Sequence, residues 1–137
     1  MNMMVNRETD YAIRVILYLA LQPERTRVSA KQLSSERIIP KAFTRRIITK
    51  LVKAGLLKSA RGLKGGVYLA KPPAQINLLE VMEAVGKPPE VSPCIENPQI
   101  CPLTSTCPVR SVWVEMDEEI KKHLRETTFE LLVQKVT

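Results

Sequence analysis

The sequence lacks the features of a membrane protein and of a disulfide-stabilised secreted protein. Its 137 residues contain no apolar run near the ~20 residues needed to cross a bilayer. Residues 1–7 are too few and too polar for the apolar region of a signal peptide. The three cysteines are an odd number, which in a reducing compartment argues against a disulfide framework and for metal or redox chemistry. We therefore expect a cytoplasmic protein without a membrane partner.

Catalytic motifs are also missing. The chain has no glycine-rich nucleotide loop, no nucleophile–base pair and no pair of carboxylates spaced for acid–base work. Its single histidine, His123, falls in a long predicted helix, where packing or solvent exposure is the simpler role. We predict that the chain is not an enzyme and has no small-molecule substrate.

Acidic residues are absent from one long stretch. No Asp or Glu occurs between Glu36 and Glu80, whereas ten Lys and Arg lie there. Residues 1–75 carry 15 basic and 4 acidic side chains (+11), and residues 76–137 carry 6 and 10 (−4). A field of one sign over that length repels itself unless a polyanion is bound. A basic surface that only faces solvent is the plain alternative, but the helices and strands predicted for this stretch favour a nucleic-acid partner.

These elements begin with three predicted helices. Residues 9–21 are apolar on nearly all sides and predict a buried central helix. Ser29 and Gln32 form a capping box that opens a short helix through about residue 36. Pro40 suits the first turn of a third helix, which runs to residue 54 and stops at Gly55. That third helix has one apolar face and one basic face.

Residues 56–60 and 66–70 then predict two short strands around a glycine-rich turn with basic residues at its tip. Three helices followed by a basic hairpin indicate a winged helix-turn-helix. The predicted fold is therefore mainly α, with a small two-stranded wing and a long C-terminal dimerisation helix. We assign residues 1–75 to the DNA-binding domain and residues 76–137 to a cysteine loop (87–108) and dimerisation helices.

The C-terminal part opens with a predicted helix over residues 77–85. Six of the ten prolines lie in residues 87–108, which excludes regular structure there. A long helix follows, with a break near Thr127 and a short last helix. Its apolar side chains recur at steps of three and four, and the helix is expected to pack against its twin in a homodimer. The predicted interface residues are Val109, Trp113, Met116, Ile120 and Leu124.

Cys94, Cys101 and Cys107 all lie within 14 residues, and each adjoins a proline. Proline stiffens the loop and lowers the entropy lost when three thiolates converge. Cys107 stands where the long helix is expected to begin, and free N–H groups at such a cap favour a thiolate. Three thiolates supply three ligands of a metal or iron–sulfur site and need a fourth. A structural zinc ion is the alternative that the residues leave open.

These elements resemble the iron–sulfur winged-helix transcription regulators of the Rrf-two family, which includes IscR, NsrR and RirA. The resemblance covers nearly the whole chain, and four segments carry it most specifically: residues 9–14 (TDYAIR), 61–69 (RGLKGGVYL), 79–85 (LEVMEAV) and the cysteine loop. It implies a homodimer that binds palindromic promoter DNA with an affinity that depends on cluster state. We therefore expect a sequence-specific DNA-binding regulator, acting as a repressor, whose cluster senses redox state, nitric oxide or iron.

The resemblance also implies the cluster ligands. Cys94, Cys101 and Cys107 match the three cysteine ligands. IscR-like members take a fourth ligand from a histidine three residues after the last cysteine, where this chain has Arg110. NsrR-like members use an aspartate of the other subunit, which Asp10 matches; Glu8 is a weaker candidate. Analogy with NsrR favours a 4Fe–4S over a 2Fe–2S cluster. The open alternatives are first-turn stabilisation by Asp10 and a cluster-free regulator that senses zinc, thiol oxidation or a small ligand.

A winged helix-turn-helix also predicts which side chains meet DNA. The start of the third helix enters the major groove, where an arginine can read guanine through two hydrogen bonds. Basic side chains further along this helix and in the first strand meet phosphates, and those at the hairpin tip flank the minor groove. The predicted groove residues are Lys41, Thr44, Arg45 and Arg46; the phosphate residues are Lys50, Lys53 and Lys58; the tip residues are Arg61 and Lys64; Ser29 and Lys31 anchor backbone oxygens.

Overall fold

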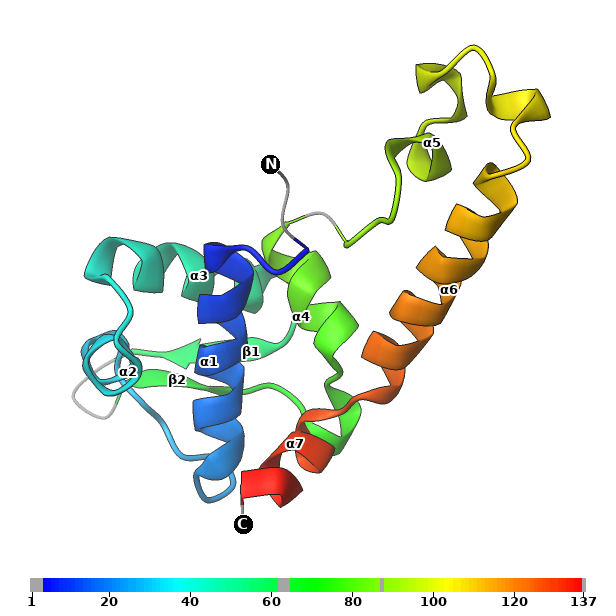
Figure 1. The fold of residues 1–137 in the computed structure, drawn as a ribbon. Coiled ribbons are helices and arrows are strands. Elements are labelled where there is room, and N and C mark those ends of the chain that lie inside the picture. Colours follow the sequence, from blue (N-terminus) through cyan, green and yellow to red (C-terminus); the bar gives the residue numbers. More distant parts are fainter. Residues whose placement is uncertain (1–3, 62–64, 87, 137) are drawn as a thin grey trace.

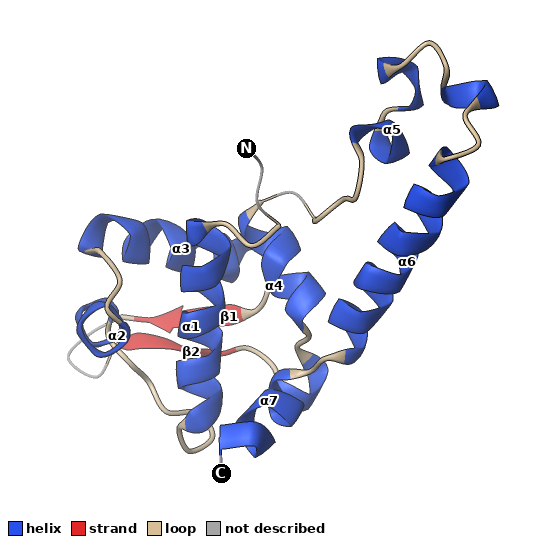
Figure 2. Ribbon diagram, in the orientation of Figure 1, coloured by secondary structure: helices blue, strands red, loops and turns tan. Residues whose placement is uncertain are grey.

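A computed structural model describes residues 4–61, 65–86 and 88–136 of the chain. The described residues form seven helices and one antiparallel hairpin (Figures 1 and 2), which confirms a mainly helical fold with a two-stranded wing. In chain order the elements are α1 (Arg7–Leu21), α2 (Ala30–Arg37), α3 (Lys41–Lys53), β1 (Leu57–Ala60), β2 (Gly66–Leu69), η1 (Pro73–Gln75), α4 (Leu78–Val85), α5 (Pro93–Glu96), η2 (Pro98–Ile100), η3 (Thr104–Thr106), α6 (Arg110–Glu126) and α7 (Phe129–Val136). None of the described helices is long and apolar enough to cross a membrane.

Helix α1 is the centre of the core. It contacts α2, α3, β2, α4 and α7, and its apolar sides are buried on several faces as the sequence predicts. Asn6 caps it by accepting a hydrogen bond from Thr9 N at 2.8 Å, so the helix starts two residues before the predicted residue 9. The side chains of α1 that are less than 5% exposed are Ala12, Val15, Ile16 and Leu19.

The hairpin β1–β2, called the wing below, covers the core with one face. Its antiparallel register pairs Leu57 with Leu69 and Lys58 with Tyr68. Leu57 and Val67 point into the core and Lys58 stays exposed, as alternation along a strand requires. Gly66 has a φ of 138°, and a Cβ there would stand 2.8 Å from the carbonyl oxygen of Val28. A glycine is therefore needed where β2 runs against the segment before α2.

The helix-turn-helix begins at Ser29 and ends at Gly55, as the sequence predicts. Ser29 accepts from Gln32 N at 3.0 Å, which is the serine half of the capping box, whereas the Gln32 amide donates to Tyr18 Oη at 3.0 Å. Gly55 ends the segment after α3 with a φ of 81°. The turn from α2 to α3 contains Ile38 in a left-handed conformation, with a φ of 55°. That conformation costs an L-residue with a Cβ on the order of 1–2 kcal/mol. Ser34 Oγ donates to the Ile39 carbonyl and closes the turn.

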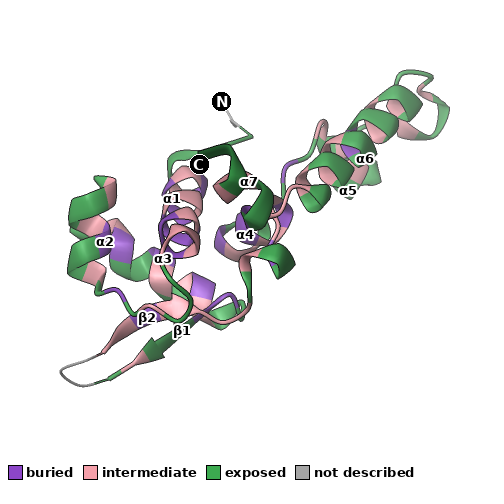
Figure 3. Cartoon of the chain, turned by 90° about the horizontal axis from the view of Figure 1, so that it is seen from below, coloured by how far each residue is buried: buried purple, intermediate pink, exposed green. Residues whose placement is uncertain are grey.

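The buried core contains residues from both sides of the predicted domain boundary at residue 75. Helix α4 packs on α1 and α3, and α7 packs on α1 (Figures 1 and 3). Ile76, Val81, Val85 and Phe129 belong to the same buried cluster as α1. Helix α6 departs from this body and reaches α4 along part of its length. The division at residue 75 stays a prediction about function, because no separate core lies behind it among the described residues.

The segment from Pro88 to Pro108 lies at the outer end of α6 (Figure 1) and corrects two expectations. It contains the short helix α5 and the 3-10 turns η2 and η3, although its prolines led us to exclude regular structure. Proline tolerates the first turn of a helix, and Pro93 and Pro98 both stand there. Cys107 ends η3, and Val109 precedes α6, so Cys107 does not cap the long helix.

Candidate functional site

A basic cleft separates α2 from the start of α3. It encloses about 400 Å³ and is lined by Ala30, Lys31, Ser34, Lys41, Ala42, Thr44 and Arg45. The three cations of this lining are exposed, and α2, the start of α3 and the outer end of the wing lie on the same side of the molecule (Figure 1). Cations beside a helix N-terminus favour phosphate binding. We call the surface formed by this cleft and the wing the reading face.

Thr44 and Lys50 are placed differently from the prediction. The Thr44 side chain is 1% exposed and its hydroxyl bonds to the Pro40 carbonyl at 3.2 Å, so it supports the turn and does not reach a base. Lys50 Nζ lies 2.7 Å from Glu8 Oε1 and 3.3 Å from the Val85 carbonyl oxygen. Its ammonium joins α3 to α1 and α4, which removes the reason to assign it to phosphate.

Arg46 is partly engaged by neighbouring side chains of the protein. Its Nε lies 3.8 Å from the carboxylate of Glu8, and its guanidinium lies 4.6 Å from the centre of the Phe43 ring. Arg45 is exposed and borders the cleft. Arg45 is therefore better placed than Arg46 to reach a base edge.

The exposed face of the wing carries cations that the sequence prediction missed. Lys58 and Tyr68 are register partners, and the guanidinium of Arg27 lies 5.7 Å from the centre of the Tyr68 ring. Arg25 and Arg27 join Lys58 and Tyr68 around a shallow pocket. The predicted tip residue Arg61 is exposed, and Lys64 lies outside the described residues. The three closely spaced cations Arg25, Arg27 and Lys31 were the signal in the sequence that could have predicted this basic surface.

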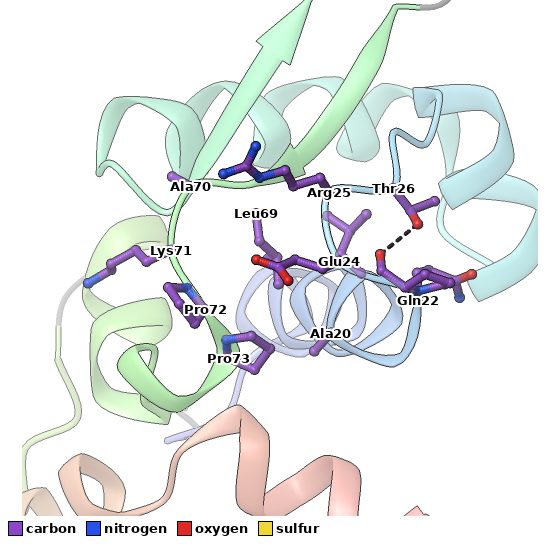
Figure 4. A pocket seen from close by; sticks show the side chains of 12 residues that line it. Ala20, Gln22, Glu24, Arg25, Thr26, Leu69, Ala70, Lys71, Pro72 and Pro73 are labelled. Atoms are coloured by element: carbon purple, nitrogen blue, oxygen red, sulfur yellow. Dashed lines mark hydrogen bonds between the residues drawn. The ribbon is translucent and has the colours of Figure 1, made fainter.

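A second pocket of about 450 Å³ lies between the end of α1 and the chain that follows β2 (Figure 4). Leu19, Ala20, Leu69 and three prolines contribute to its apolar walls, and Glu24, Arg25 and Lys71 stand around it. Thr26 Oγ1 donates to the Pro23 carbonyl at 2.6 Å and fixes the loop at its edge. Small ligands favour mostly apolar concave sites with a few polar groups.

The cysteine loop presents three free thiols at the outer end of α6. Cys101 is exposed, and Cys94 and Cys107 are partly buried, with Cys94 Sγ 3.3 Å from Ser92 Oγ. Among the described residues, no three His, Cys, Asp or Glu side chains come together in a way that could hold one metal ion. The described residues of one chain therefore carry three thiols, which are soft metal ligands, on one loop, but do not bring a complete set of ligands together.

Two side chains of α6 hold this loop. Arg110 Nη2 donates to the Cys94 carbonyl at 3.4 Å, while its Nε is buried without a hydrogen-bond partner in the described part of the chain. Asp117, 4% exposed, accepts from Val91 N at 3.1 Å and pairs with Lys121 at 2.8 Å. An unsatisfied cationic donor on a side chain that bonds to the backbone of Cys94 fits a negatively charged group at this loop.

Asp10 lies on α1, in a chain of contacts that leads to the helix-turn-helix. Its carboxylate accepts from Arg14 Nη2 at 2.7 Å. Arg14 Nη1 donates to the carbonyls of Arg37 (3.1 Å) and Ile38 (3.4 Å) in the turn between α2 and α3. Glu8, the weaker candidate, instead pairs with Lys50 at 2.7 Å. Of the two acids, Asp10 is the more exposed, at 46% of its side chain against 26% for Glu8.

Helix α6 leaves an apolar stripe uncovered. Val109, Val112 and Met116 are 44%, 47% and 42% exposed, and the other predicted interface residues, Trp113, Ile120 and Leu124, are partly buried. Val112 extends the predicted stripe. A stripe of this size on a helix that projects from the body favours a partner surface.

The family model of an iron-dependent transcriptional regulator matches residues 5–135. The chain belongs to the Rrf2 family. It is 33% identical over 111 residues to the HTH-type transcriptional regulator NsrR of Shouchella clausii, covering 80% of this chain and 74% of that one. The NsrR of Halalkalibacterium halodurans is 32% identical over 124 residues, which are 90% of this chain and 83% of that one. Both relatives are named as transcriptional regulators and neither as an enzyme.

Solved structures confirm the winged-helix fold of this Rrf2-family regulator. CymR of B. subtilis, described as its global cysteine regulator, superimposes with a TM-score of 0.79 at 22% identity, covering 98% of both chains. IscR of T. potens also has a TM-score of 0.79 at 22% identity and covers 100% of this chain and 90% of that one. At this identity the two likenesses concern the fold alone.

Substituting Arg45 and Lys53 is expected to have different effects on DNA binding. Arg45→Ala is expected to relax base preference at one position of the bound DNA, because a guanine contact is worth roughly 1–3 kcal/mol. Lys53→Ala is expected to weaken all duplexes alike and to flatten the salt dependence by about one unit, because Lys53 is exposed at the far end of α3. Fluorescence anisotropy on operator and scrambled duplexes at several salt concentrations measures both. Equal effects of the two variants would contradict this division.

Proposed function

We propose that this chain is a dimeric, sequence-specific DNA-binding repressor whose operator affinity is controlled by an iron–sulfur cluster. The observation that carries the proposal is the presence, in one Rrf2-family chain, of a basic reading face and of three free thiols on the loop at the outer end of α6. When bound, the cluster supplies chemistry that responds to oxygen, nitric oxide or iron supply. The 4Fe–4S form is favoured over 2Fe–2S by analogy with NsrR.

Cys94, Cys101 and Cys107 would hold the cluster, and Asp10 of the second subunit would complete it. Two observations support this assignment. The described thiols of one chain form no closed set of ligands with an acid of the same chain. Both acids are in ion pairs at 2.7 Å, Asp10 with Arg14 and Glu8 with Lys50, but the Asp10 side chain is 46% exposed against 26% for Glu8. One carboxylate among thiolates is the harder and weaker ligand for iron, which suits a site that must respond.

Dimerisation through the uncovered stripe of α6 would place two reading faces on one operator. A twofold dimer matches a pseudo-palindromic site whose half-sites lie one helical turn apart. The same helix starts beside the cysteine loop, so the two functions share one element. Arg14 would then link the cluster to DNA binding, because it joins Asp10 to the carbonyls of the α2–α3 turn.

The proposal is tested on protein reconstituted without air from ferrous iron and sulfide. A visible chromophore is expected, with iron and sulfide in equal amounts, and exposure to nitric oxide is expected to change operator affinity at least tenfold. Cys101→Ser, which removes the exposed thiol, is expected to stay colourless and to bind DNA without responding to nitric oxide. Colourless wild-type protein with iron and sulfide at background would overturn the cluster assignment.

Asp10 has a test of its own. Asp10→Ala is expected to shorten the lifetime of the reconstituted cluster several-fold, because a water molecule replaces the fourth ligand. Glu8→Ala is the matched control, since it removes a neighbouring carboxylate of α1 that already pairs with Lys50. An Asp10→Ala protein with an unchanged absorption spectrum and cluster lifetime would assign Asp10 to stabilising α1 and its contact with Arg14.

A cluster-free regulator is the second candidate. It is favoured by the 450 Å³ pocket beside α1. In that case zinc, thiol oxidation or a small ligand would set the DNA affinity. Operator affinity that is the same with and without cluster, but that changes on oxidation of the exposed Cys101, would favour this candidate.

A further inference from the structure

Ile38 has a backbone conformation that its side chain disfavours. It follows α2 with a φ of 55°, a left-handed conformation in which helices commonly end on glycine or asparagine. A β-branched residue is a clear outlier there, because its side chain crowds the backbone. Glycine would satisfy the turn without strain. The local fold therefore gives no reason for an isoleucine.

Packing gives no reason either. The Ile38 side chain is 83% exposed, the highest value among the large apolar side chains that the structure describes. Its backbone, by contrast, is held: its N–H donates to the Ser34 carbonyl, and its carbonyl accepts from Arg14 Nη1 at 3.4 Å. A rigid backbone thus presents a strained apolar side chain to solvent. Strained residues that the surrounding structure holds in place occur mainly at functional sites.

The position of Ile38 limits what it could contact. It stands in the turn between α2 and α3, the two helices that line the basic cleft with Lys31, Lys41 and Arg45. These cations attract phosphates and base acceptors, whereas an isoleucine attracts neither. The major groove offers one apolar group, the C5 methyl of thymine. We infer that Ile38 contacts a thymine methyl in each operator half-site and adds sequence preference to a mostly cationic surface. The inference rests on the proposed DNA-binding function.

The experiment begins by selecting duplexes from a random pool with the wild-type protein. Each thymine of the selected duplex is then replaced by uracil, which lacks only the methyl group, and binding is measured by fluorescence anisotropy. One replacement per half-site is expected to weaken the wild type roughly fourfold, the value of one methyl-sized apolar contact. The same replacement is expected to leave Ile38→Gly unaffected, and Ile38→Gly itself is expected to bind the thymine duplex as weakly as the wild type binds the uracil duplex.

Thermal unfolding separates a lost contact from a damaged fold. Ile38→Gly is expected to raise the unfolding midpoint by about 3–5 °C, because the strain is removed and no buried contact is lost. Ile38→Ala is expected to bind DNA as weakly as Ile38→Gly does, but without the rise in the unfolding midpoint. Val136→Ala is the control, since it truncates an apolar side chain that is 61% exposed at the other end of the chain. It is expected to bind as the wild type does.

Two results would overturn the inference. The first is an Ile38→Gly protein that binds the selected duplex as tightly as the wild type does. The second is an equal response of the two proteins to the uracil replacements. Either result shows that Ile38 reads no methyl group, while DNA binding stands. Failure of the wild-type protein to enrich any duplex overturns the proposed function together with this inference.

Discussion

Replacing Met116 by aspartate is expected to lower operator affinity by about a thousandfold. Met116 is 42% exposed in the single chain, in the apolar stripe of α6 that is proposed to face its twin. A carboxylate there would be buried without a partner at the twofold axis, close to its copy in the other subunit. The substitution would therefore break the dimer and leave the monomer folded. A monomer binds one half-site and loses the gain from simultaneous binding to two.

Light scattering gives the mass of the variant, and anisotropy gives its affinity. Arg125→Asp is the matched control, because it lies nine residues further along the same helix, about half a turn around from Met116 in angle. It introduces the same carboxylate, with a net-charge change of −2 against −1 for Met116→Asp, and is expected to remain a dimer that binds the operator. A dimeric Met116→Asp protein, or a wild type that is monomeric at micromolar concentration, would place the dimer interface elsewhere or remove it.

Replacing Phe129 by alanine is expected to reduce the free energy of unfolding by about 3–5 kcal/mol. Phe129 is 0% exposed and heads the largest fully buried side chains among the described residues. Its N–H donates to the Ile76 carbonyl at 2.9 Å, so it attaches the start of α7 to the segment before α4. Removing the ring leaves a cavity where α7 packs on α1. Such a loss is a large share of the ~5–15 kcal/mol that stabilises a typical domain.

Urea unfolding followed by circular dichroism measures this effect, at one protein concentration throughout because the proposed dimer would contribute to stability. Leu131→Ala, two residues along the same helix and 47% exposed, is expected to cost less than about 1 kcal/mol. Since α7 lies away from the reading face, the folded fraction of Phe129→Ala is expected to bind DNA normally. A cost below about 1 kcal/mol for Phe129→Ala would mean that α7 does not complete the core.

Several parts of the fold could be predicted because they depend on residues close together in the sequence. Ser29, Pro40, Gly55 and Asn77 mark helix ends through bonds to neighbours within a few positions, and each stands at or next to a helix boundary. The wing follows from two short apolar runs around a glycine-rich turn. Cys107 was the exception, because the turn η3 ends on it before α6 starts.

The candidate site was less predictable, because side-chain direction depends on distant partners. Thr44 and Lys50 both look like members of the basic face of α3. The hydroxyl of Thr44 is buried against the Pro40 carbonyl, and the ammonium of Lys50 is paired with a carboxylate 42 residues earlier. The contact of Arg14 with the α2–α3 turn spans 23 and 24 residues and has no periodic signal. Only the packing of α1 against both elements creates it.

Composition and local pattern were enough to predict a basic N-terminal half, a winged helix-turn-helix and a loop of three thiols. Those features depend on residue type and short spacing, which the order of residues carries directly. Three-dimensional packing was needed to show which cations remain exposed, that Asp10 reaches the helix-turn-helix through Arg14, and that Ile38 is both strained and exposed. Each of these depends on which surfaces of the helices are covered, and the covering elements lie far away along the chain.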